Sequence, residues 1–510
     1  MHTATAEKLH GRAFYESIGS PKYIVAPMVD QSEFAWRMLT RSFMPESEQS
    51  KLLAYTPMLH ARLFAHEEKY RKAHFQAVRP GSDEPWLDGN PSIDRPLFVQ
   101  FCANDASVLL SAAKEVAPHC DAVDLNLGCP QGIARRGNYG AFLQEDQELV
   151  FRLINTLHKE LPVPVTAKIR ILETKERTLE YAQNVLRAGA SILTVHGRRR
   201  EQKGHMTGLA DWAMLRFLRD ELPPDTVIFA NGNVLQEGDV DACLEATGAD
   251  GVMSAEGNLS DPAIFAKAPP VGQEGREYWR GKYGKGGWRV DAMTRRYLDI
   301  LHKYVLGADP PSRRPLFQSG DDTAWMEEGE RADADADAEE PPKKRRRKDG
   351  GPKNQDHTAS SSSPSPNLSA VQAHLFHLLR HLVTRHTDVR DMLARSSKGG
   401  GGVAAFERIL AAVERKVAEG LLEYERTGGK SFDDERPWWV AQPIIRPLPS
   451  EALAKGAITL SKKEKKAAAK TVAAGKGVNG VDKGVDDGRE KALAEGKREE
   501  IAARDDLVAG

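Results

Sequence analysis

A cysteine stands directly after a short stretch that predicts a buried strand, at a place where its thiol could take part in a reaction. Residues Ala122–Leu127 alternate apolar and polar side chains, and the pattern stops at Gly128. Cys129 comes next, and Pro130 cannot continue a strand ladder. A thiol at the carboxyl end of a strand, beside a glycine that lets a ligand approach the backbone, is placed for chemistry. From position alone, Cys129 is equally well explained as a small buried apolar residue.

Polar residues also follow the other predicted strands. Active sites of α/β barrels lie at the carboxyl ends of the strands, so residues at these ends are expected to meet at one mouth. Packing alone does not account for polar side chains gathered at one end of an apolar core. The residues at these ends are Pro27-Met28, Thr56-Pro57, Gln100, Asn126, Lys168, Arg170, His196, Arg198, Asn231–Asn233 and Ser254–Gly257.

The elements that would position these residues repeat as a strand followed by a helix from Lys22 to Ala266. About eight such units predict an α/β fold, a (β/α)8 TIM barrel. An open doubly wound sheet gives the same alternation, but no G-x-G-x-x-G follows the first strand, which counts against a Rossmann domain. Predicted helices include Glu145–Lys159 and Thr178–Ala188. The predicted strands are Tyr23–Ala26, Leu52–Tyr55, Leu97–Phe101, Ala122–Leu127, Val165–Ile169, Ile192–Val195, Val227–Ala230 and Gly251–Met253.

The segment Leu125-Asn-Leu-Gly-Cys-Pro130 resembles the active-site signature of the tRNA-dihydrouridine synthases, flavin enzymes that reduce uridines in tRNA. The resemblance runs from about Tyr23 to Phe265, returns after Leu368, and is strongest to the eukaryotic branch that acts on positions 16 and 17 of the D-loop. Any one segment alone would be a weak signal, whereas the five together are specific. The four further segments match the family in order: Ala26–Val29, Ala167–Arg170, Val195–Arg198 and Ala230–Asn233.

The resemblance implies FMN as the cofactor and NADPH or NADH as the electron donor, which would dock transiently over the flavin. Barrels commonly bind a phosphate after the seventh and eighth strands, which here would be the phosphate of FMN. Gln100 would hydrogen-bond the pyrimidine ring of the flavin, Lys168 would place a positive charge near it, and His196 would bind the flavin or its phosphate. The implied cofactor residues are Pro27, Met28, Val29, Gln100, Lys168, His196, Asn231, Gly232, Asn233, Ala255, Glu256 and Gly257.

The implied reaction needs a hydride at C6 of uridine, from N5 of the reduced flavin, and a proton at C5. A thiol has a pKa of roughly 8.5, so it is mostly protonated near pH 7 and can act as a general acid, the role implied for Cys129. A base in folded RNA must leave its stack to reach such a pocket, which favours a loop nucleotide. The implied substrate-binding residues are Asn126, Arg135, Arg170 and Arg198, the last within a cationic stretch that continues to Lys203.

The remaining segments predict a smaller helical domain that, by resemblance, binds tRNA. Its predicted helices are Trp288–Val305, Ser369–Arg395 and Val403–Arg426, and Pro437–Val440 looks like a docking strap. A polar insert and the C-terminal tail should be disordered because they have little to bury. The predicted segments are 1–20 (lead-in), 21–270 (catalytic barrel), 271–308 (start of the helical domain), 309–368 (disordered insert), 369–448 (helical domain and strap) and 449–510 (disordered tail).

Composition sets further bounds on the 510-residue chain. The formal net charge of −1 gives no global case for nucleic-acid binding, so an RNA surface must come from local asymmetry. The four cysteines show no C-x-x-C spacing, and no signal peptide or long apolar span is seen. We therefore expect a monomer in a reducing compartment, with no metal and no membrane partner. The basic run Lys343–Lys348 is either a nuclear localisation signal or an RNA-attracting patch, so the nucleus and the cytoplasm are both expected.

Two other functions stay open. A small-molecule FMN oxidoreductase of the dihydroorotate dehydrogenase type would share the barrel and Lys168, but would not need the helical domain or the cationic stretch after the sixth strand. A catalytically silent RNA-binding protein would have no reason to keep the cysteine and the flavin-binding ring together. The long connection Arg79–Arg95, rich in Gly, Pro, Asp and Ser, is expected on the substrate side of the barrel.

Overall fold

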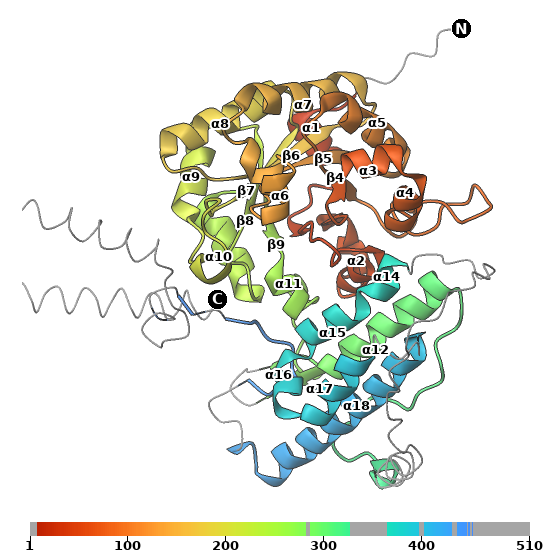
Figure 1. Cartoon of the computed structure of the whole chain (residues 1–510). Helices are drawn as coiled ribbons and strands as arrows, with labels where there is room; N and C mark the ends of the chain where they lie inside the picture. Colours follow the sequence, from red (N-terminus) through yellow and green to blue (C-terminus); the bar gives the residue numbers. More distant parts are fainter. Residues whose placement is uncertain are drawn as a thin grey trace, which may run out of the picture. The chain divides into compact units, whose positions relative to one another are not determined.

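The computed structural model describes residues 8–281, 286–326, 365–396, 402–430, 436–445, 447–448 and 451, which form two compact units (Figure 1). Of these residues, the first unit contains those up to Lys267 and those from Gln442 on, and the second contains those between Ala268 and Ala441. The basic run Lys343–Lys348 and the predicted tail beyond Glu451 lie outside the described residues. Within the described part, every helix is too short or too polar to cross a bilayer.

A closed ring of parallel strands forms the centre of the first unit. The sheet has nine strands in the order β2-β1-β9-β8-β7-β6-β5-β4-β3, and β2 also pairs with β4, which closes the ring and leaves β3 outside it. The predicted (β/α)8 TIM barrel is therefore confirmed, and each predicted strand is found with its ends shifted by one residue at most. The strands are β1 (Tyr23–Val25), β2 (Leu52–Tyr55), β3 (Leu59–His60), β4 (Leu97–Cys102), β5 (Ala122–Leu127), β6 (Val165–Arg170), β7 (Ile192–His196), β8 (Val227–Asn231) and β9 (Gly251–Ser254).

Amphipathic helices surround this ring and bury their apolar faces against it (Figure 1). Four of them begin with a side chain that accepts a hydrogen bond from the backbone of the first turn, at Asp105, Asp146, Thr174 and Asp211. The helices are α2 (Phe34–Arg41), α3 (Ala61–His66), α4 (Glu68–His74), α5 (Ala106–Val116), α6 (Gly132–Arg136), α7 (Gln147–Glu160), α8 (Lys175–Arg187), α9 (Trp212–Glu221), α10 (Glu237–Thr247) and α11 (Glu256–Ser260), with short 3-10 turns between them.

The helix α1 (Gly11–Ser17) closes the amino end of the barrel. Its buried side chains Phe14 and Tyr15 pack against rings of the strands, with centroids 5.9 Å from Phe98 and 5.9 Å from Phe229 respectively. The Tyr15 hydroxyl donates to the carbonyl oxygen of Asp250, which precedes β9. The described residues of the predicted lead-in are therefore an integral part of the barrel.

The long connection Arg79–Arg95 lies at the amino ends of the strands, so its expected place on the substrate side is wrong. Gly89 packs so closely on the backbone of His119 that a Cβ there would lie 1.8 Å from its carbonyl oxygen. Arg95 pairs with Asp121, just before β5, at 3.0 Å. The reason is topological, because this connection leads into β4, whereas the mouth is built by the segments that follow strands.

The second unit is a helical bundle with a short hairpin. The predicted helix Trp288–Val305 begins two residues later than expected, because Trp288 belongs to the hairpin. The predicted helix Ser369–Arg395 is interrupted at Leu379 and His386, where the backbone leaves helical geometry. The elements are β10 (Tyr278–Arg280), β11 (Gly286–Trp288), α12 (Val290–Ile300) with a π-helical turn (Leu301–Leu306), α14 (Pro366–Ser369), α15 (Val371–Leu378), α16 (Arg380–Arg385), α17 (Thr387–Arg395) and α18 (Gly402–Arg426).

The predicted insert 309–368 needs correction at both ends. Arg313 pairs with Asp299 at 2.5 Å and with Glu407 at 2.8 Å, and Leu316 and Phe317 are buried, so the segment up to residue 326 is packed. Here partly buried ion pairs and buried apolar side chains offset the polar composition on which the prediction of disorder depended. Residues 327–364, the rest of the predicted insert up to α14, lie outside the described residues.

The predicted strap Pro437–Val440 packs within the second unit. Trp439 is fully buried, its carbonyl oxygen accepts a hydrogen bond from the backbone N–H of Val290 at 2.9 Å, and its ring contacts Trp279. The backbone N–H of Ala441 in turn donates to Trp288. The strap therefore joins the hairpin to the start of α12.

Candidate active site

The loop that carries Cys129 is fixed by Asn126, the second-last residue of strand β5. The Asn126 Oδ1 atom accepts hydrogen bonds from the backbone N–H groups of Cys129 at 2.9 Å and Gly128 at 3.2 Å. On the other side Gly140, with φ +65°, packs against Cys129, where a Cβ would lie 2.8 Å from its carbonyl oxygen. That carbonyl accepts from the N–H of Ala141 at 3.1 Å. The half-buried thiol of Cys129 is thus presented on a rigid loop at the carboxyl end of its strand.

A buried hydrogen-bond chain inside the barrel determines how Asn126 is turned. Asp124 accepts from the Thr166 hydroxyl at 2.6 Å and from Gln100 Nε2 at 2.8 Å. Gln100 Oε1 then accepts from Asn126 Nδ2 at 2.8 Å. Since an ionised carboxylate can only accept, Asp124 sets the direction of both amides and leaves Asn126 Oδ1 facing the Cys129 loop.

The sequence analysis did not single out Asp124 or Thr166. The signal was present, since residues 124 and 126 lie two apart on one strand and must face the same side. Burial raises the pKa of Asp124 to about 6, although its two hydrogen bonds act in the opposite sense. Gln100 is fully buried with one donor and one acceptor used by this chain, so its implied contact with a flavin ring stays a prediction.

Two cations lie next to Cys129 on the neighbouring strand β6. Lys168 is in register with Asn126, and Arg170 Nε donates to the carbonyl oxygen of Gly128 at 2.7 Å. Burial, followed by the charge of Arg170, lowers the pKa of Lys168 to about 8. The Lys168 ammonium has no hydrogen-bond partner among the described residues. A half-buried, unpartnered cation at a barrel mouth is suited to an anionic or electron-rich ligand.

A second cluster is centred on Arg198, in the loop after β7. Its guanidinium donates to His196 Nε2 at 3.1 Å, to Asn233 Oδ1 at 2.5 Å and to the carbonyl oxygen of Gly208 at 3.0 Å. Burial lowers the pKa of His196 well below its usual value, and the neighbouring cations, Arg170 first, act in the same direction. The imidazole is therefore neutral near pH 7, and its Nε2 atom accepts a hydrogen bond from the guanidinium.

The loop after β8 has the backbone expected of a phosphate-binding loop. Gly232 has φ +116° and Asn233 has φ +60°, so two successive residues adopt left-handed conformations. A Cβ on Gly232 would lie 2.7 Å from the Cβ of Ala210, so a side chain does not fit. Gly257, after β9, packs as closely on the carbonyl oxygen of Val234. This close backbone packing beside the Arg198 guanidinium fits an anionic group such as the phosphate of FMN.

The cluster around Cys129 and the cluster around Arg198 are connected by residues that lie opposite each other on neighbouring strands. Arg170 on β6 is opposite His196 on β7, which is opposite Asn231 on β8. The Asn231 amide donates to the carbonyl oxygen of Met253 on β9 at 3.0 Å. A continuous row of polar residues therefore runs around the mouth from the Cys129 side to the loops after β8 and β9.

The remaining predicted residues lie at the rim. Pro27 and Met28, after β1, are half-buried, and Val29 is exposed. Ala255 and Glu256 are half-buried after β9, where Glu256 begins α11. The described part of the chain has no cluster of side chains suited to holding a metal ion.

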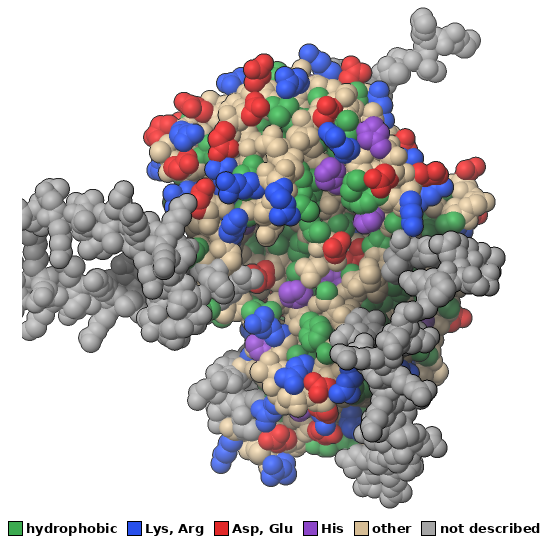
Figure 2. Space-filling model, in the orientation of Figure 1, with side chains coloured by type: hydrophobic (Ala, Val, Ile, Leu, Met, Phe, Trp, Pro, Cys, Tyr) green, Lys and Arg blue, Asp and Glu red, His purple; other side chains and the backbone are tan. Residues whose placement is uncertain are grey.

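Basic residues gather beside the Cys129 loop. Arg135 is exposed on α6, and Lys203, in the loop after β7, donates to the carbonyl oxygen of Pro130 at 2.6 Å. Figure 2 shows Lys and Arg side chains grouped on this face of the barrel unit, over α6 and the neighbouring loops. Arg200 in the same loop pairs with Glu145 at 2.7 Å, so the group is partly neutralised.

Comparison with known proteins decides the family of the chain. The sequence profile of the family Dihydrouridine synthase (Dus) matches residues 24–281, which include both clusters and the strand ring from the second residue of β1 on. The chain belongs to the dihydrouridine synthase family. A tRNA-dihydrouridine(16/17) synthase [NAD(P)(+)] of Schizosaccharomyces pombe is 40% identical over 87% of this chain and 92% of its own length.

Further relatives of this dihydrouridine synthase family member cover both of its units. The protein of that name from Saccharomyces cerevisiae is 41% identical over 88% of this chain and 89% of its own length. A tRNA-dihydrouridine(16/17) synthase [NAD(P)(+)]-like protein of Mus musculus is 36% identical over 87% of this chain and 72% of its own length. The similarity therefore extends well beyond the barrel that the family profile matches.

Proposed function

We propose that this protein is an FMN-dependent tRNA-dihydrouridine synthase that reduces the C5=C6 bond of uridines 16 and 17 in the tRNA D-loop, with NADPH or NADH as electron donor. The names of its relatives support the substrate and the donor. One observation supports the chemistry most directly, namely that Asn126 holds the loop of Cys129 at the barrel mouth with Lys168 and Arg170 beside it.

The residues at the mouth fit FMN. The Gly232–Asn233 backbone and the Arg198 guanidinium would hold its phosphate, and Lys168 would lie near its pyrimidine ring. Pro27 and Met28 would pack against its edge. When bound and reduced, FMN supplies a hydride to C6 of the uridine.

Cys129 would complete the reduction as a general acid. Its thiol proton would go to C5, quenching the negative charge that hydride addition leaves on C5 and O4. The thiolate that remains would be stabilised by Lys168 and Arg170, both of which are electrostatically coupled to Cys129. Water at the open mouth would then return the proton, because Cys129 is only half-buried.

The RNA would approach over the cationic face of the barrel. Arg135 and the basic residues that follow Arg198, from Arg199 to Lys203, would pair with phosphates, which position an RNA without reading its sequence. The helical second unit would supply further contact with the tRNA. The basic run Lys343–Lys348 would direct part of the protein to the nucleus.

The experiment is to incubate the purified protein with NADPH and an unmodified tRNA transcript and to map dihydrouridine position by position. We expect a yellow protein with an FMN spectrum and dihydrouridine at positions 16 and 17. A yellow protein that reduces a small pyrimidine substrate but no tRNA would favour the dihydroorotate dehydrogenase type. A colourless protein that binds tRNA and cannot be loaded with FMN would favour a silent RNA-binding role.

A further inference from the structure

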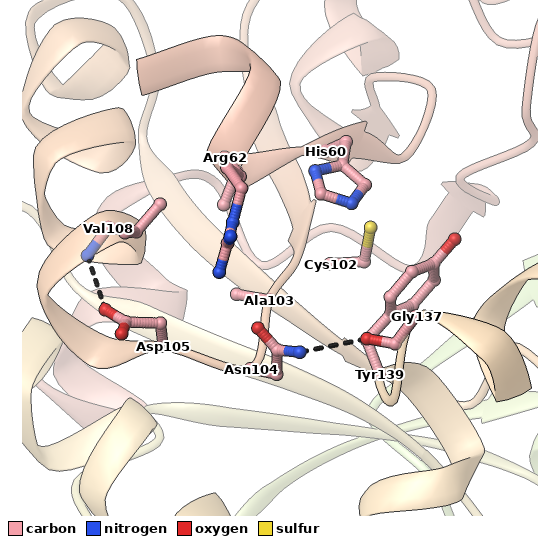
Figure 3. A pocket seen from close by; sticks show the side chains of 10 residues that line it. His60, Arg62, Cys102, Ala103, Asn104, Asp105, Val108, Gly137 and Tyr139 are labelled. Atoms are coloured by element: carbon pink, nitrogen blue, oxygen red, sulfur yellow. Dashed lines mark hydrogen bonds between the residues drawn. The ribbon is translucent and has the colours of Figure 1, made fainter. Parts of the chain in front are cut away.

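A cavity of about 280 Å³ is lined by the residues shown in Figure 3. It opens at the carboxyl ends of β3 and β4, on the same side of the barrel as Cys129. Cys102, the last residue of β4, and Tyr139 form its inner wall and pack together with Cys129 in one cluster. The cavity is therefore a direct neighbour of the reacting thiol. Its lining residues are His60, Ala61, Arg62, Cys102, Ala103, Asn104, Asp105, Val108, Gly137 and Tyr139.

The proposed reaction gives no role to the polar groups around this cavity. The exposed Arg62 makes neither an ion pair nor a hydrogen bond with the described residues. The Nδ1 atom of His60 is buried and has no hydrogen-bond partner. Asn104 donates through Nδ2 to the carbonyl oxygen of Gly137 at 2.9 Å, which leaves its own side-chain oxygen available (Figure 3). Donors and acceptors thus converge on one space without satisfying each other.

The charge around the cavity favours a base over a phosphate. Asp105 caps α5 by accepting from the N–H of Val108 at 2.9 Å, and this hydrogen bond lowers the pKa of Asp105, so it is ionised near pH 7. A carboxylate repels a phosphate, but it accepts from the amino or imino group of a base. The apolar side chains of Ala103 and Val108 suit the face of a planar ring.

The size of the cavity also favours a single base as the ligand. Its volume of about 280 Å³ lies just below the roughly 300–1,000 Å³ typical of ligand pockets. That space admits one base and is too small for a dinucleotide such as NADPH. An arginine side chain can lie on the face of a base or donate to its edge, and Arg62 stands at the rim where either contact can form.

We propose that this cavity binds the base of the nucleotide next to the uridine that is being reduced. The inference rests on the proposed function, since it requires an RNA substrate. Arg62 would contact the face or a carbonyl group of the neighbouring base, and Asn104 and Asp105 would accept from its N–H groups. Holding the neighbouring base beside Cys102 would splay the two nucleotides apart and leave the target uridine over Cys129.

Two variants test the cavity from the protein side. Arg62→Ala removes the cation at the rim, and Val108→Trp fills the space from α5. Since a base contact of this kind is worth about tenfold in binding, we expect each variant to lower kcat/KM for dihydrouridine formation about tenfold. The rate at which NADPH reduces the bound flavin without RNA should not change. The matched control is Arg152→Ala, which removes an exposed arginine from the outer surface of α7 and should leave both rates unchanged.

Two tRNA transcripts test it from the RNA side, each with one abasic nucleotide, either 5′ or 3′ of the measured uridine. We expect one of them to lower kcat/KM of the wild-type protein about tenfold and to abolish the difference between wild type and Arg62→Ala. The proposal is overturned if neither abasic site matters, or if Arg62→Ala loses activity equally on intact and abasic RNA. Absence of dihydrouridine in every RNA treated with the wild-type protein would instead overturn the proposed function.

Discussion

The side-chain oxygen of Asn126 accepts a hydrogen bond from the backbone N–H of Cys129, with 2.9 Å between the two atoms. The same oxygen accepts from Gly128, so the shape of the loop depends on which way the amide of Asn126 is turned. That direction is set by Gln100, which accepts from Asn126 Nδ2 and donates to Asp124. A carboxylate in the barrel interior therefore fixes the position of a thiol at the mouth.

Replacing Asn126 should slow the chemical step. Asn126→Ala removes the acceptor of two N–H groups and leaves Gln100 Oε1 without its donor, which costs about 1–3 kcal/mol for each buried group that loses its partner. We expect the rate of dihydrouridine formation in a single turnover to fall about 10- to 100-fold, while the flavin content stays near that of the wild type. A variant that turns over at the wild-type rate would show that the loop holds Cys129 without this amide.

The thiol of Cys129 should matter for turnover and not for cofactor binding. General acid catalysis by a positioned group contributes about 10²- to 10⁴-fold, so Cys129→Ala should lose that factor in dihydrouridine formation. It should still be isolated with bound flavin that NADPH reduces at the usual rate. Cys120→Ala is the matched control, because Cys120 lies before the amino end of the same strand. Full activity of Cys129→Ala would refute its role as the proton donor.

The sequence predicted the barrel well, because its strands are short apolar runs and its helices have clear apolar faces. It also predicted one shared mouth for Lys168, Arg170, His196 and Cys129, since all four residues follow or end parallel strands that share one edge. The structure places Lys168 and Arg170 beside the Cys129 loop and His196 opposite Arg170. Strand periodicity fixes which residues reach the mouth. It does not fix which of them contact each other, such as Arg198 with His196 and Asn233. The implied contact of Arg198 with the substrate stays a prediction.

The residue that sequence analysis missed, Asp124, and the segment that it wrongly predicted as disordered, around Arg313, both depend on partners far away in the sequence. In the sequence, Asp124 is one polar position in an alternating strand. Its place at the start of a hydrogen-bond chain is seen only from its contacts with Thr166 and Gln100 on the neighbouring strands. Arg313 sits in a polar stretch that resembles disordered sequence, but it pairs with Glu407, 94 residues further on. Such long-range pairs leave no local periodicity in the sequence.

The charge of Lys168 should make cofactor binding depend on pH. Burial lowers its pKa to about 8, so the ammonium loses its proton as the pH rises through that value. We expect the affinity for FMN, measured by quenching of flavin fluorescence, to weaken between pH 7 and pH 9. In Lys168→Met the affinity should be weaker throughout and nearly independent of pH. A wild-type affinity that stays constant over this range would place the ammonium away from the cofactor.

The same group should affect the stability of the protein without cofactor. The ordinary pKa of lysine is 10.5, so between about pH 8 and this value the unfolded chain binds more protons at Lys168 than the folded protein does. Its contribution to the free energy of unfolding therefore rises with pH in this window and is lost as the pH falls through about 8. The melting temperature of the wild type relative to Lys168→Met should rise over that window, and a flat or falling difference would contradict the assignment.

Two glycine substitutions should distinguish a specific effect on FMN binding by the loop after β8 from a general loss of stability. Gly232→Ala places a methyl group 2.7 Å from the Cβ of Ala210, on a residue with φ +116°, so the loop must change shape. In Gly238→Ala, within α10, the added Cβ meets nothing within 4 Å. Since alanine favours a helix by roughly 1 kcal/mol over glycine, Gly238→Ala should melt at or above the wild-type temperature and bind FMN normally. Gly232→Ala should be isolated largely free of flavin, with an affinity for added FMN reduced at least tenfold. If both variants bound FMN as the wild type does, the phosphate would have to be held somewhere other than the loop that follows β8.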